Sequence, residues 1–101
     1  MKPRQIIRCV DVIARRGDAF VVIERLSKPF GLAFPGGKIE CGETPQGAIA
    51  REFGEETGFE LEVRGIVGFY DDPRRDPRGR YVSTVMHGTA SGVPKEEPGK
   101  T

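Results

Sequence analysis

The chain has 101 residues and a formal net charge of +1, because its 16 lysines and arginines nearly balance its 15 acidic residues. A chain of this length forms one domain with a modest core, so we expect a single domain over residues 1–101. The balance of charge gives no general attraction to nucleic acid or to a membrane surface. With no signal peptide and no apolar run long enough to cross a bilayer, the sequence predicts a cytoplasmic protein without nucleic-acid or membrane partners.

The first third of the chain predicts strands joined by turns. Residues 6–14 and 19–26 are rich in β-branched side chains and flank a turn signal at 15–18, which favours a hairpin. A loop containing a proline and a glycine follows, and residues 38–40 form a short extended piece after the Pro-Gly-Gly of 35–37. We therefore expect a hairpin and a glycine-rich loop ahead of the next element.

That next element is a helix over residues 45–57. Thr44 is a good N-cap, a proline occupies the first helical position, and Gly58 follows as a C-cap glycine. Ile49 and Phe53 are four residues apart and therefore lie on one side of the helix. We expect this side to pack into the core.

The remainder of the chain predicts further strands. Residues 60–70 alternate weakly between apolar and polar side chains, which indicates one or two strands broken near Gly65. A charged loop with two prolines spans residues 71–79, and residues 81–89 form another strand. The tail over residues 91–101 has no buried pattern and is expected to be flexible.

Three glutamates of the predicted helix share one face. Glu52, Glu55 and Glu56 stand at i, i+3 and i+4, where each like-charged pair costs about a few tenths of a kcal/mol. A cation between them would remove this repulsion, and Mg²⁺ is the natural candidate because it prefers oxygen ligands from carboxylates and substrate phosphates. From the helix alone, a solvated acidic face in which Arg51 pairs with Glu55 remains an open alternative.

The flanking sequence favours the metal. Residues 37–59 follow the pattern G-x5-E-x7-R-E-U-x-E-E-x-G-U of the Nudix box, with phenylalanine at both apolar U positions. The fixed positions are Gly37, Glu43, Arg51, Glu52, Glu55, Glu56 and Gly58. The chain therefore resembles the Nudix hydrolase family, whose members include the MutT-like enzymes. The resemblance implies an α/β (α+β) Nudix fold, a mixed β-sheet sandwiched between helices, with the box as a metal-binding loop-helix-loop.

The resemblance also implies the metal ligands. Glu52 and Glu56 are expected to be the main ligands of Mg²⁺, for which Mn²⁺ can substitute. Glu55 is expected to be a further or water-bridged ligand, and Gly36 a ligand through its carbonyl oxygen. All four donors are oxygen atoms, which suits a hard cation.

Three box residues are expected to support these ligands. Arg51 would orient the carboxylates, and Glu43 would hold the loop against the helix. Gly37, together with Gly36, would form a tight turn that brings backbone oxygen to the ion.

The family resemblance implies hydrolysis of the pyrophosphate bond in a nucleoside diphosphate linked to another group. Such a reaction needs a general base, and the resemblance implies that it comes either from the box or from a loop closer to the C-terminus. The candidates within the box are Glu52 and Glu55, with Arg51 as the third catalytic residue. Arg25 and Arg80 are candidate substrate contacts, against the alternative that both are ordinary surface arginines.

Two features point to different substrates. The segment 70–81, with Pro73 after the box, resembles the ADP-ribose pyrophosphatase branch and favours cleavage of ADP-ribose to AMP and ribose 5-phosphate. Residues 34–40 resemble the MutT-like enzymes, which keeps a (d)NTP pyrophosphohydrolase as the alternative. Tyr70 and Tyr81 are candidates for stacking on a base or for lining the edge of the core, and His87 is expected to be structural.

The sequence departs from the family after residues 81–89, because the further strands and the C-terminal helix of a Nudix domain are missing. If the strand at 81–89 is then an uncovered sheet edge, a second copy of the chain would cover it, so we expect a homodimer. An inactive fragment or a nucleotide-sensing module that does not cut its ligand is the alternative of another class. The intact box and the lack of a helix-turn-helix favour the enzyme.

Overall fold

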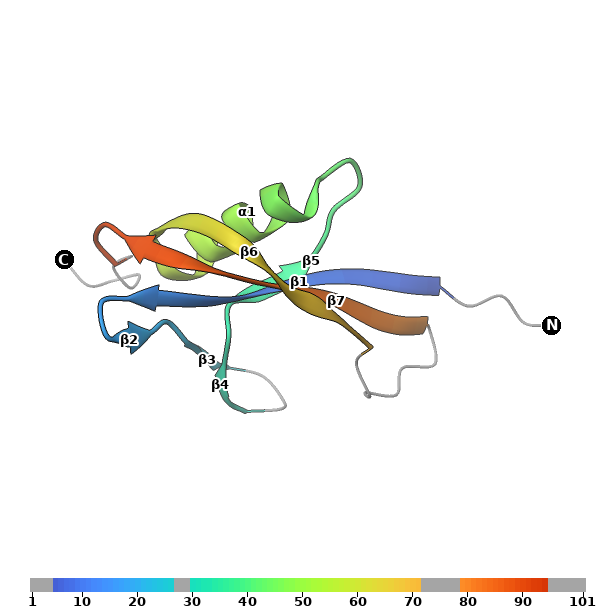
Figure 1. Ribbon diagram of the computed structural model, residues 1–101. Coiled ribbons are helices and arrows are strands. Elements are labelled where there is room, and N and C mark those ends of the chain that lie inside the picture. Colours follow the sequence, from blue (N-terminus) through green and yellow to red (C-terminus); the bar gives the residue numbers. More distant parts are fainter. Residues whose placement is uncertain (1–4, 27–29, 72–78, 95–101) are drawn as a thin grey trace.

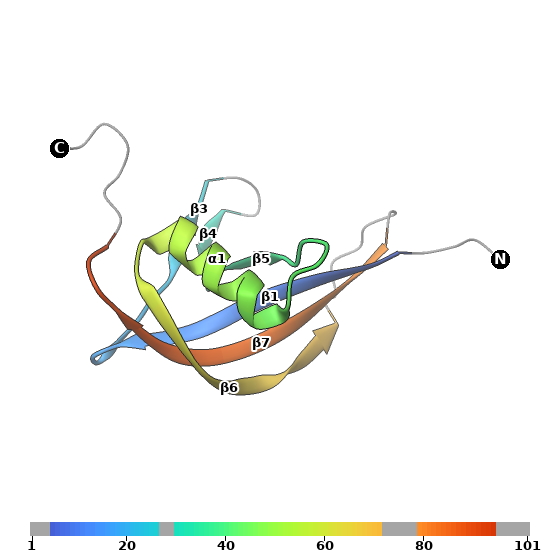
Figure 2. The ribbon, with the colours of Figure 1, turned by 90° about the horizontal axis from the view of Figure 1, so that it is seen from above.

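The computed structural model describes residues 5–26, 30–71 and 79–94 (Figure 1). In chain order the elements are β1 (Gln5–Arg16), β2 (Ala19–Phe20), β3 (Ile23–Arg25), β4 (Gly31–Ala33), β5 (Gly36–Lys38), α1 (Pro45–Thr57), β6 (Glu60–Asp71) and β7 (Gly79–Ser91). Five strands form a mixed sheet, and β3 and β4 form a separate two-stranded sheet. The helix crosses one face of the mixed sheet (Figure 2). The expected α+β fold with a mixed sheet is confirmed.

The two long strands β1 and β7 form the centre of the mixed sheet. They run parallel, with Gln5 opposite Gly79 at one end of the register and Arg15 opposite Thr89 at the other. Strand β6 pairs antiparallel with the other side of β7, and β2 and β5 pair antiparallel with β1. The expectation that residues 81–89 form an uncovered edge is therefore wrong, because β7 has a neighbour on each side. Within the described residues, the outer strand on this side is β6.

The expected hairpin is shorter than the sequence predicts. The chain turns at Gly17, which has a φ of 63°, and only Ala19 and Phe20 then pair with β1. After the N–H of Val21 donates to the carbonyl of Ala14 at 2.9 Å, the chain leaves the mixed sheet. Strand β3 pairs with β4 instead, so residues 19–26 contribute to two sheets.

Helix α1 begins and ends where the sequence predicts. The Oγ1 atom of Thr44 accepts a hydrogen bond from the N–H of Gly47 at 3.0 Å, which caps the N-terminus. Gly58 adopts a φ of 77° and its N–H donates to the carbonyl of Gly54 at 2.9 Å, which ends the helix. The predicted bounds 45–57 are confirmed because both ends depend on local residues alone.

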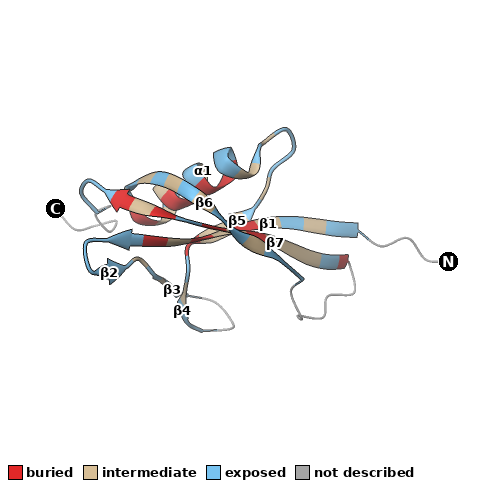
Figure 3. Ribbon diagram, in the orientation of Figure 1, coloured by how far each residue is buried: buried red, intermediate tan, exposed pale blue. Residues whose placement is uncertain are grey.

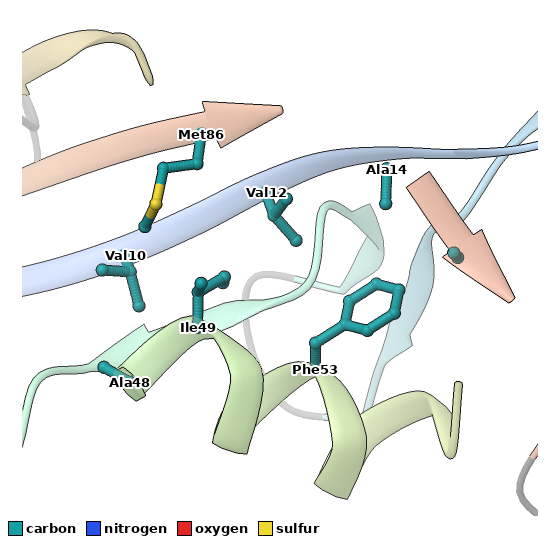
Figure 4. Close-up of a cluster of buried hydrophobic side chains, with 8 residues drawn as sticks. Val10, Val12, Ala14, Ala48, Ile49, Phe53 and Met86 are labelled. Atoms are coloured by element: carbon teal, nitrogen blue, oxygen red, sulfur yellow. The ribbon is translucent and has the colours of Figure 1, made fainter. Parts of the chain in front are cut away.

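The core lies between α1 and one face of the mixed sheet (Figures 3 and 4). The helix contributes Ile49 and Phe53, as expected, and alternate residues of β1 and β7 meet them from the sheet. The buried members are Val10, Val12, Ala14, Ala48, Ile49, Phe53, Met86 and Ala90. Since successive strand residues point to opposite faces, the odd-numbered residues of β1 are directed to the other face of the sheet.

Strand β6 is continuous but irregular. Its pairing with β7 shifts in register between Val63 and Gly65 and again between Ile66 and Gly68, which explains the weak alternation in the sequence. His87 lies opposite Gly65, where an added Cβ would stand 2.7 Å from the imidazole Nε2. The histidine thus packs on the backbone of β6, a placement that agrees with a structural role.

Helix α1 is the one helix of the described residues, so a second helical layer on the opposite face is not seen in this part of the chain. No helix among these residues is long and apolar enough to cross a membrane. Most of the charged loop expected at 71–79, and most of the tail expected at 91–101, fall outside the described residues.

Candidate active site

Two carboxylates of the helix meet two successive residues of β5. The Oε1 atom of Glu56 accepts a hydrogen bond from the N–H of Gly36 at 3.0 Å. Glu52 reaches the next residue, because a Cβ added at Gly37 would stand 2.5 Å from the Cδ of Glu52. The box helix therefore presents Glu52 and Glu56, the two predicted main ligands, to the backbone of β5. That backbone contains the carbonyl of Gly36, which is also a predicted ligand.

Gly36 and Gly37 belong to a strand. They pair with Asp11 and Val10 of β1, and neither has a positive φ. The expected tight turn is wrong. Glycine is required here because a Cβ at Gly36 would stand 2.1 Å from the carbonyl oxygen of Val10, so neighbouring elements approach too closely for a side chain.

The carbonyl of Gly36 faces the box helix. The N–H of Val12 donates to the carbonyl of Pro35 at 3.0 Å, which makes this pair a hydrogen-bonded position of the ladder. Such positions alternate in an antiparallel pair, so the next residue, Gly36, has its N–H and carbonyl pointing away from β1. Because the N–H of Gly36 reaches Glu56, the carbonyl lies on the same side of β5 as that carboxylate.

Arg51 holds the box together through its guanidinium group. It forms two bonds with Glu43, Nε to Oε2 at 2.8 Å and Nη2 to Oε1 at 3.0 Å. Its Nη1 lies 2.9 Å from the Oε1 of Glu52 and 3.5 Å from the Oε2 of Glu55, and Nη2 donates to the carbonyl of Lys38 at 3.2 Å. The pairing with Glu55 is thus one of several contacts, and the same arginine ties β5 and the loop before α1 to the helix.

These contacts keep Arg51 and Glu43 charged. The hydrogen bonds from the guanidinium, with a further one from the N–H of Glu40, hold the pKa of the Glu43 carboxyl below its usual value. The same carboxylate raises the pKa of Arg51. The pair therefore supports the site as a fixed ion pair at any pH near neutrality.

Glu56 is shifted in the opposite direction. Burial raises the pKa of its carboxyl to about 6, against the lowering effect of the hydrogen bond from Gly36. The negative charges of Glu52, Asp11 and Glu55 raise it further. A carboxylate in such surroundings is ionised more easily when a cation is close to it.

A pocket of about 340 Å³ opens beside these groups. Its lining comes from β1, β3, β4, β5, β7, the residue after β4 and the helix, and it includes Asp11, Arg25, Phe34, Glu56, Tyr81 and Ser83. The volume lies in the range of small-molecule sites. Arg25 and Tyr81 both line this pocket, and their contact with a substrate stays a prediction.

Arg80 is placed elsewhere. Its guanidinium pairs with Asp71 on β6, and it is not part of the pocket lining. Tyr70, also on β6, is half exposed. The pairing of Arg80 with Asp71, away from the pocket, favours the alternative of a surface arginine. A substrate contact by Arg80 stays a prediction.

Asp11 and Ser83 are pocket residues that the sequence-based hypotheses did not include. Asp11 stands opposite Gly36, and its Oδ2 accepts a hydrogen bond from the Oγ of Ser83. The available signal was a single acidic residue inside an otherwise apolar strand, which does not by itself indicate a pocket.

A NUDIX domain model matches residues 2–101. The chain belongs to the Nudix family. The ADP-ribose pyrophosphatase of Methanocaldococcus jannaschii is 44% identical over 79 residues, which cover 76% of this chain and 47% of that protein. The 8-oxo-dGTP diphosphatase of Escherichia coli K12 is 67% identical over 28 residues, 28% of this chain and 22% of that enzyme. The Nudix chain thus spans about half, or less, of the length of these curated relatives.

Solved structures agree with this assignment. A bifunctional NMN adenylyltransferase/ADP ribose pyrophosphatase from Francisella tularensis, complexed with AMP and a manganese ion, has a TM-score of 0.72 and 31% sequence identity to this Nudix chain. The similarity covers 94% of this chain and 31% of that protein. The fold of the described residues is therefore that of a Nudix domain.

Nudix hydrolases use divalent metal, and the donors present here fit one. In the part of the chain that the structure describes, no group of three or more Asp, Glu, His or Cys side chains is placed so that it could hold a metal ion. The site offers two carboxylates instead, Glu56 at the N–H of Gly36 and Glu52 beside Gly37. This sparse oxygen set suits Mg²⁺ or Mn²⁺, because such ions keep several waters and complete their shell with substrate phosphate oxygens.

The raised pKa of Glu56 predicts the pH dependence of the metal-free protein. Its folded-state pKa of about 6 exceeds the ordinary value of 4.5, so folding takes up protons between these values. Stability should therefore fall as the pH rises from about 4.5 to about 6, and thermal melts in EDTA would measure this. Glu56→Gln should flatten that dependence, whereas Glu43→Gln should retain it, because the lowered pKa of Glu43 acts below this window. An unchanged slope in Glu56→Gln would contradict the prediction.

Proposed function

We propose that this chain is a Mg²⁺-dependent pyrophosphohydrolase that cleaves ADP-ribose to AMP and ribose 5-phosphate. The observation that carries this proposal is the convergence of Glu52 and Glu56 on the Gly36–Gly37 backbone beside a pocket of about 340 Å³. The 44% identity to an archaeal ADP-ribose pyrophosphatase supports the choice of substrate.

The ion would be held by Glu52, Glu56 and the Gly36 carbonyl, with Glu55 as a further or water-bridged ligand. When bound, Mg²⁺ neutralises charge on the pyrophosphate oxygens and lowers the pKa of an attacking water. Mn²⁺ is a reasonable substitute, since the similar Francisella protein was solved with AMP and a manganese ion.

The side chains of the box position the ligands and move the proton. Arg51 holds Glu52 at 2.9 Å and is itself fixed by Glu43, so the carboxylate of Glu52 is oriented before any ligand arrives. In the reaction the water oxygen bonds to one phosphorus, and the bond from that phosphorus to the bridging oxygen breaks. We propose that the proton released by the water goes to Glu52 or Glu55, the two candidates within the box, against the alternative of a base in a loop closer to the C-terminus.

A MutT-like (d)NTP pyrophosphohydrolase is the second candidate. The observation that favours it is the 67% identity over 28 residues to an 8-oxo-dGTP diphosphatase. That match is confined to 28% of the chain, whereas the match to the ADP-ribose pyrophosphatase extends over 76%. We therefore prefer ADP-ribose.

Product analysis on a substrate panel tests the proposal. ADP-ribose, an ADP-hexose, a dinucleoside polyphosphate and dGTP would each be incubated with Mg²⁺ or with EDTA, and the products separated by chromatography. We expect equal amounts of AMP and ribose 5-phosphate from ADP-ribose with Mg²⁺, and none with EDTA. Pyrophosphate released from dGTP alone would favour the second candidate. Binding of ADP-ribose without any product would identify a sensing module and contradict the enzyme.

We also propose that the protein forms a homodimer through β6. This strand is the outer strand of the mixed sheet in the described residues, and its Ile66, Val67 and Phe69 are 50%, 48% and 69% exposed. Unpaired backbone groups and exposed apolar side chains of an edge strand favour pairing with a second copy. Light scattering at micromolar concentration should give the mass of a dimer, and Phe69→Lys should shift it to that of a monomer. A monomeric unmodified chain would rule the dimer out.

A further inference from the structure

A carboxylate outside the box faces the pocket. Asp11 stands on β1 between Val10 and Val12, whose side chains are fully buried in the core, so its own side chain is directed to the other face of the sheet. There it lines the pocket together with Glu56 from the helix. The strand register thus places an acidic group in the pocket from an element that carries no box residue.

The carboxylate of Asp11 is fixed from two sides. Its Oδ2 accepts a hydrogen bond from the Oγ of Ser83 on β7. Its Oδ1 lies against the backbone of Gly36, where an added Cβ would stand 2.4 Å away. Asp11 therefore adjoins the residue whose carbonyl faces the proposed metal position.

The negative charge of Asp11 has no ion-pair partner among the described residues. Glu56, which lines the same pocket, is also negatively charged. The positively charged side chains of the lining are Arg25 from β3 and Lys38 from β5. An ionised carboxylate only accepts hydrogen bonds, so it attracts hydroxyl groups and repels phosphate oxygens at short range. The part of the pocket next to Asp11 thus suits a polyol better than a further phosphate.

We propose that Asp11 is a specificity-determining residue, which accepts hydrogen bonds from the hydroxyl groups of the sugar attached to the pyrophosphate and disfavours a third phosphate there. This rests on the proposed function, since it assumes that the pyrophosphate is held at Glu52 and Glu56. A carboxylate oxygen can accept more than one hydrogen bond, so Asp11 can accept from a sugar hydroxyl while it is held by Ser83, as an acidic residue accepts from a ribose hydroxyl in dinucleotide-binding folds. Ser83 is a positioning residue that holds the carboxylate in this orientation.

The test compares three substrates in the unmodified protein and in three variants, one of which, Ser83→Ala, removes the hydrogen bond to Asp11. Asp11→Asn keeps the shape of the side chain and removes its charge. Asp18→Asn, a matched change of an exposed carboxylate in the turn between β1 and β2, is the control. The substrates are ADP-ribose, ATP and the β-methyl ester of ADP, which has the same pyrophosphate linkage but no sugar hydroxyls on the far phosphate.

In Asp11→Asn we expect kcat/KM for ADP-ribose to fall about tenfold, the size of a lost hydrogen bond to a charged group. We expect kcat/KM for ATP to rise and that for the methyl ester to stay within about twofold of the unmodified protein, because the ester has no hydroxyl to lose. The Asp18→Asn variant should match the unmodified protein on all three substrates. In Ser83→Ala, the ratio of kcat/KM for ADP-ribose to kcat/KM for ATP should shift in the same direction by a smaller factor.

Several outcomes would overturn the proposal. If a folded Asp11→Asn protein keeps the same ratio of kcat/KM for ADP-ribose to kcat/KM for ATP, Asp11 has no role in specificity. An equal loss on all three substrates would assign Asp11 a purely structural role. If Asp11→Asn does not fold, an unchanged ratio in Ser83→Ala would overturn the proposal instead. If the unmodified protein releases no AMP from ADP-ribose, the proposed function fails separately. Calorimetric binding of ADP-ribose and ATP to the unmodified protein and to Asp11→Asn still tests the role of Asp11.

Discussion

Replacing Glu52 or Glu56 by glutamine is expected to lower the turnover of ADP-ribose by about a hundredfold or more while the protein stays folded. Each change removes a charged oxygen ligand of the proposed metal site without altering the volume of the side chain. Glu56→Gln should also stabilise the metal-free protein slightly, because the pKa of Glu56, raised to about 6, shows that its ionised form is disfavoured there. Steady-state kinetics with Mg²⁺ and thermal melts would measure both effects.

The matched control is Glu62→Gln on β6. Its side chain is 68% exposed and contacts Arg64, away from the box, so the same chemical change should leave turnover near that of the unmodified protein. Near-normal rates in both Glu52→Gln and Glu56→Gln would refute the assignment of these residues as metal ligands.

Gly37→Ala is expected to reduce turnover about as strongly as Glu52→Gln does, while the free energy of unfolding changes little. The added Cβ would stand 2.5 Å from the Cδ of Glu52. This atom belongs to the far end of a flexible side chain, which can swing aside at little cost in folding free energy. The swing removes the carboxylate from its place beside the Gly36–Gly37 backbone, so the loss should appear in catalysis rather than in folding.

Two other glycines provide the contrast. Gly36→Ala would bring a Cβ to 2.1 Å from the carbonyl oxygen of Val10, and backbone cannot yield easily, so we expect a loss of about 1–3 kcal/mol or more in unfolding free energy. Gly54→Ala lies in the helix and meets nothing within 4 Å, so it should stabilise by up to about 1 kcal/mol with normal turnover. Urea unfolding and kinetics on all three variants would separate the effects. Normal turnover in Gly37→Ala would contradict the close approach of Glu52.

The parts of the fold that the sequence predicts well depend on neighbours in the chain. The bounds of α1 follow from the N-cap at Thr44 and the C-cap at Gly58, and both act within one turn of the helix. The contact of Arg51 with Glu55, four residues further along the helix, likewise follows from helical spacing and is present in the structure. Local geometry was sufficient in each case.

The parts that the sequence does not predict depend on contacts between distant segments. Strand β7 is central because residues 79–91 pair with β1 on one side and β6 on the other, which no local pattern in β7 reveals. Gly36 and Gly37 look like a turn in the sequence, but their need for glycine comes from β1 and from the helix. Asp11 enters the pocket only because β1 pairs with β5 and β7 at that point.

The most direct test of the central claim is a titration with Mn²⁺ followed by the EPR signal of the free ion. The protein would be saturated with the α,β-methylene analogue of ADP-ribose, which provides phosphate oxygens but is not cleaved at the bridge. We predict that the unmodified protein and Glu62→Gln deplete the free Mn²⁺ signal, and that the double variant Glu52→Gln, Glu56→Gln does so at least about tenfold more weakly. Equal depletion by the double variant would place the metal elsewhere and contradict the account.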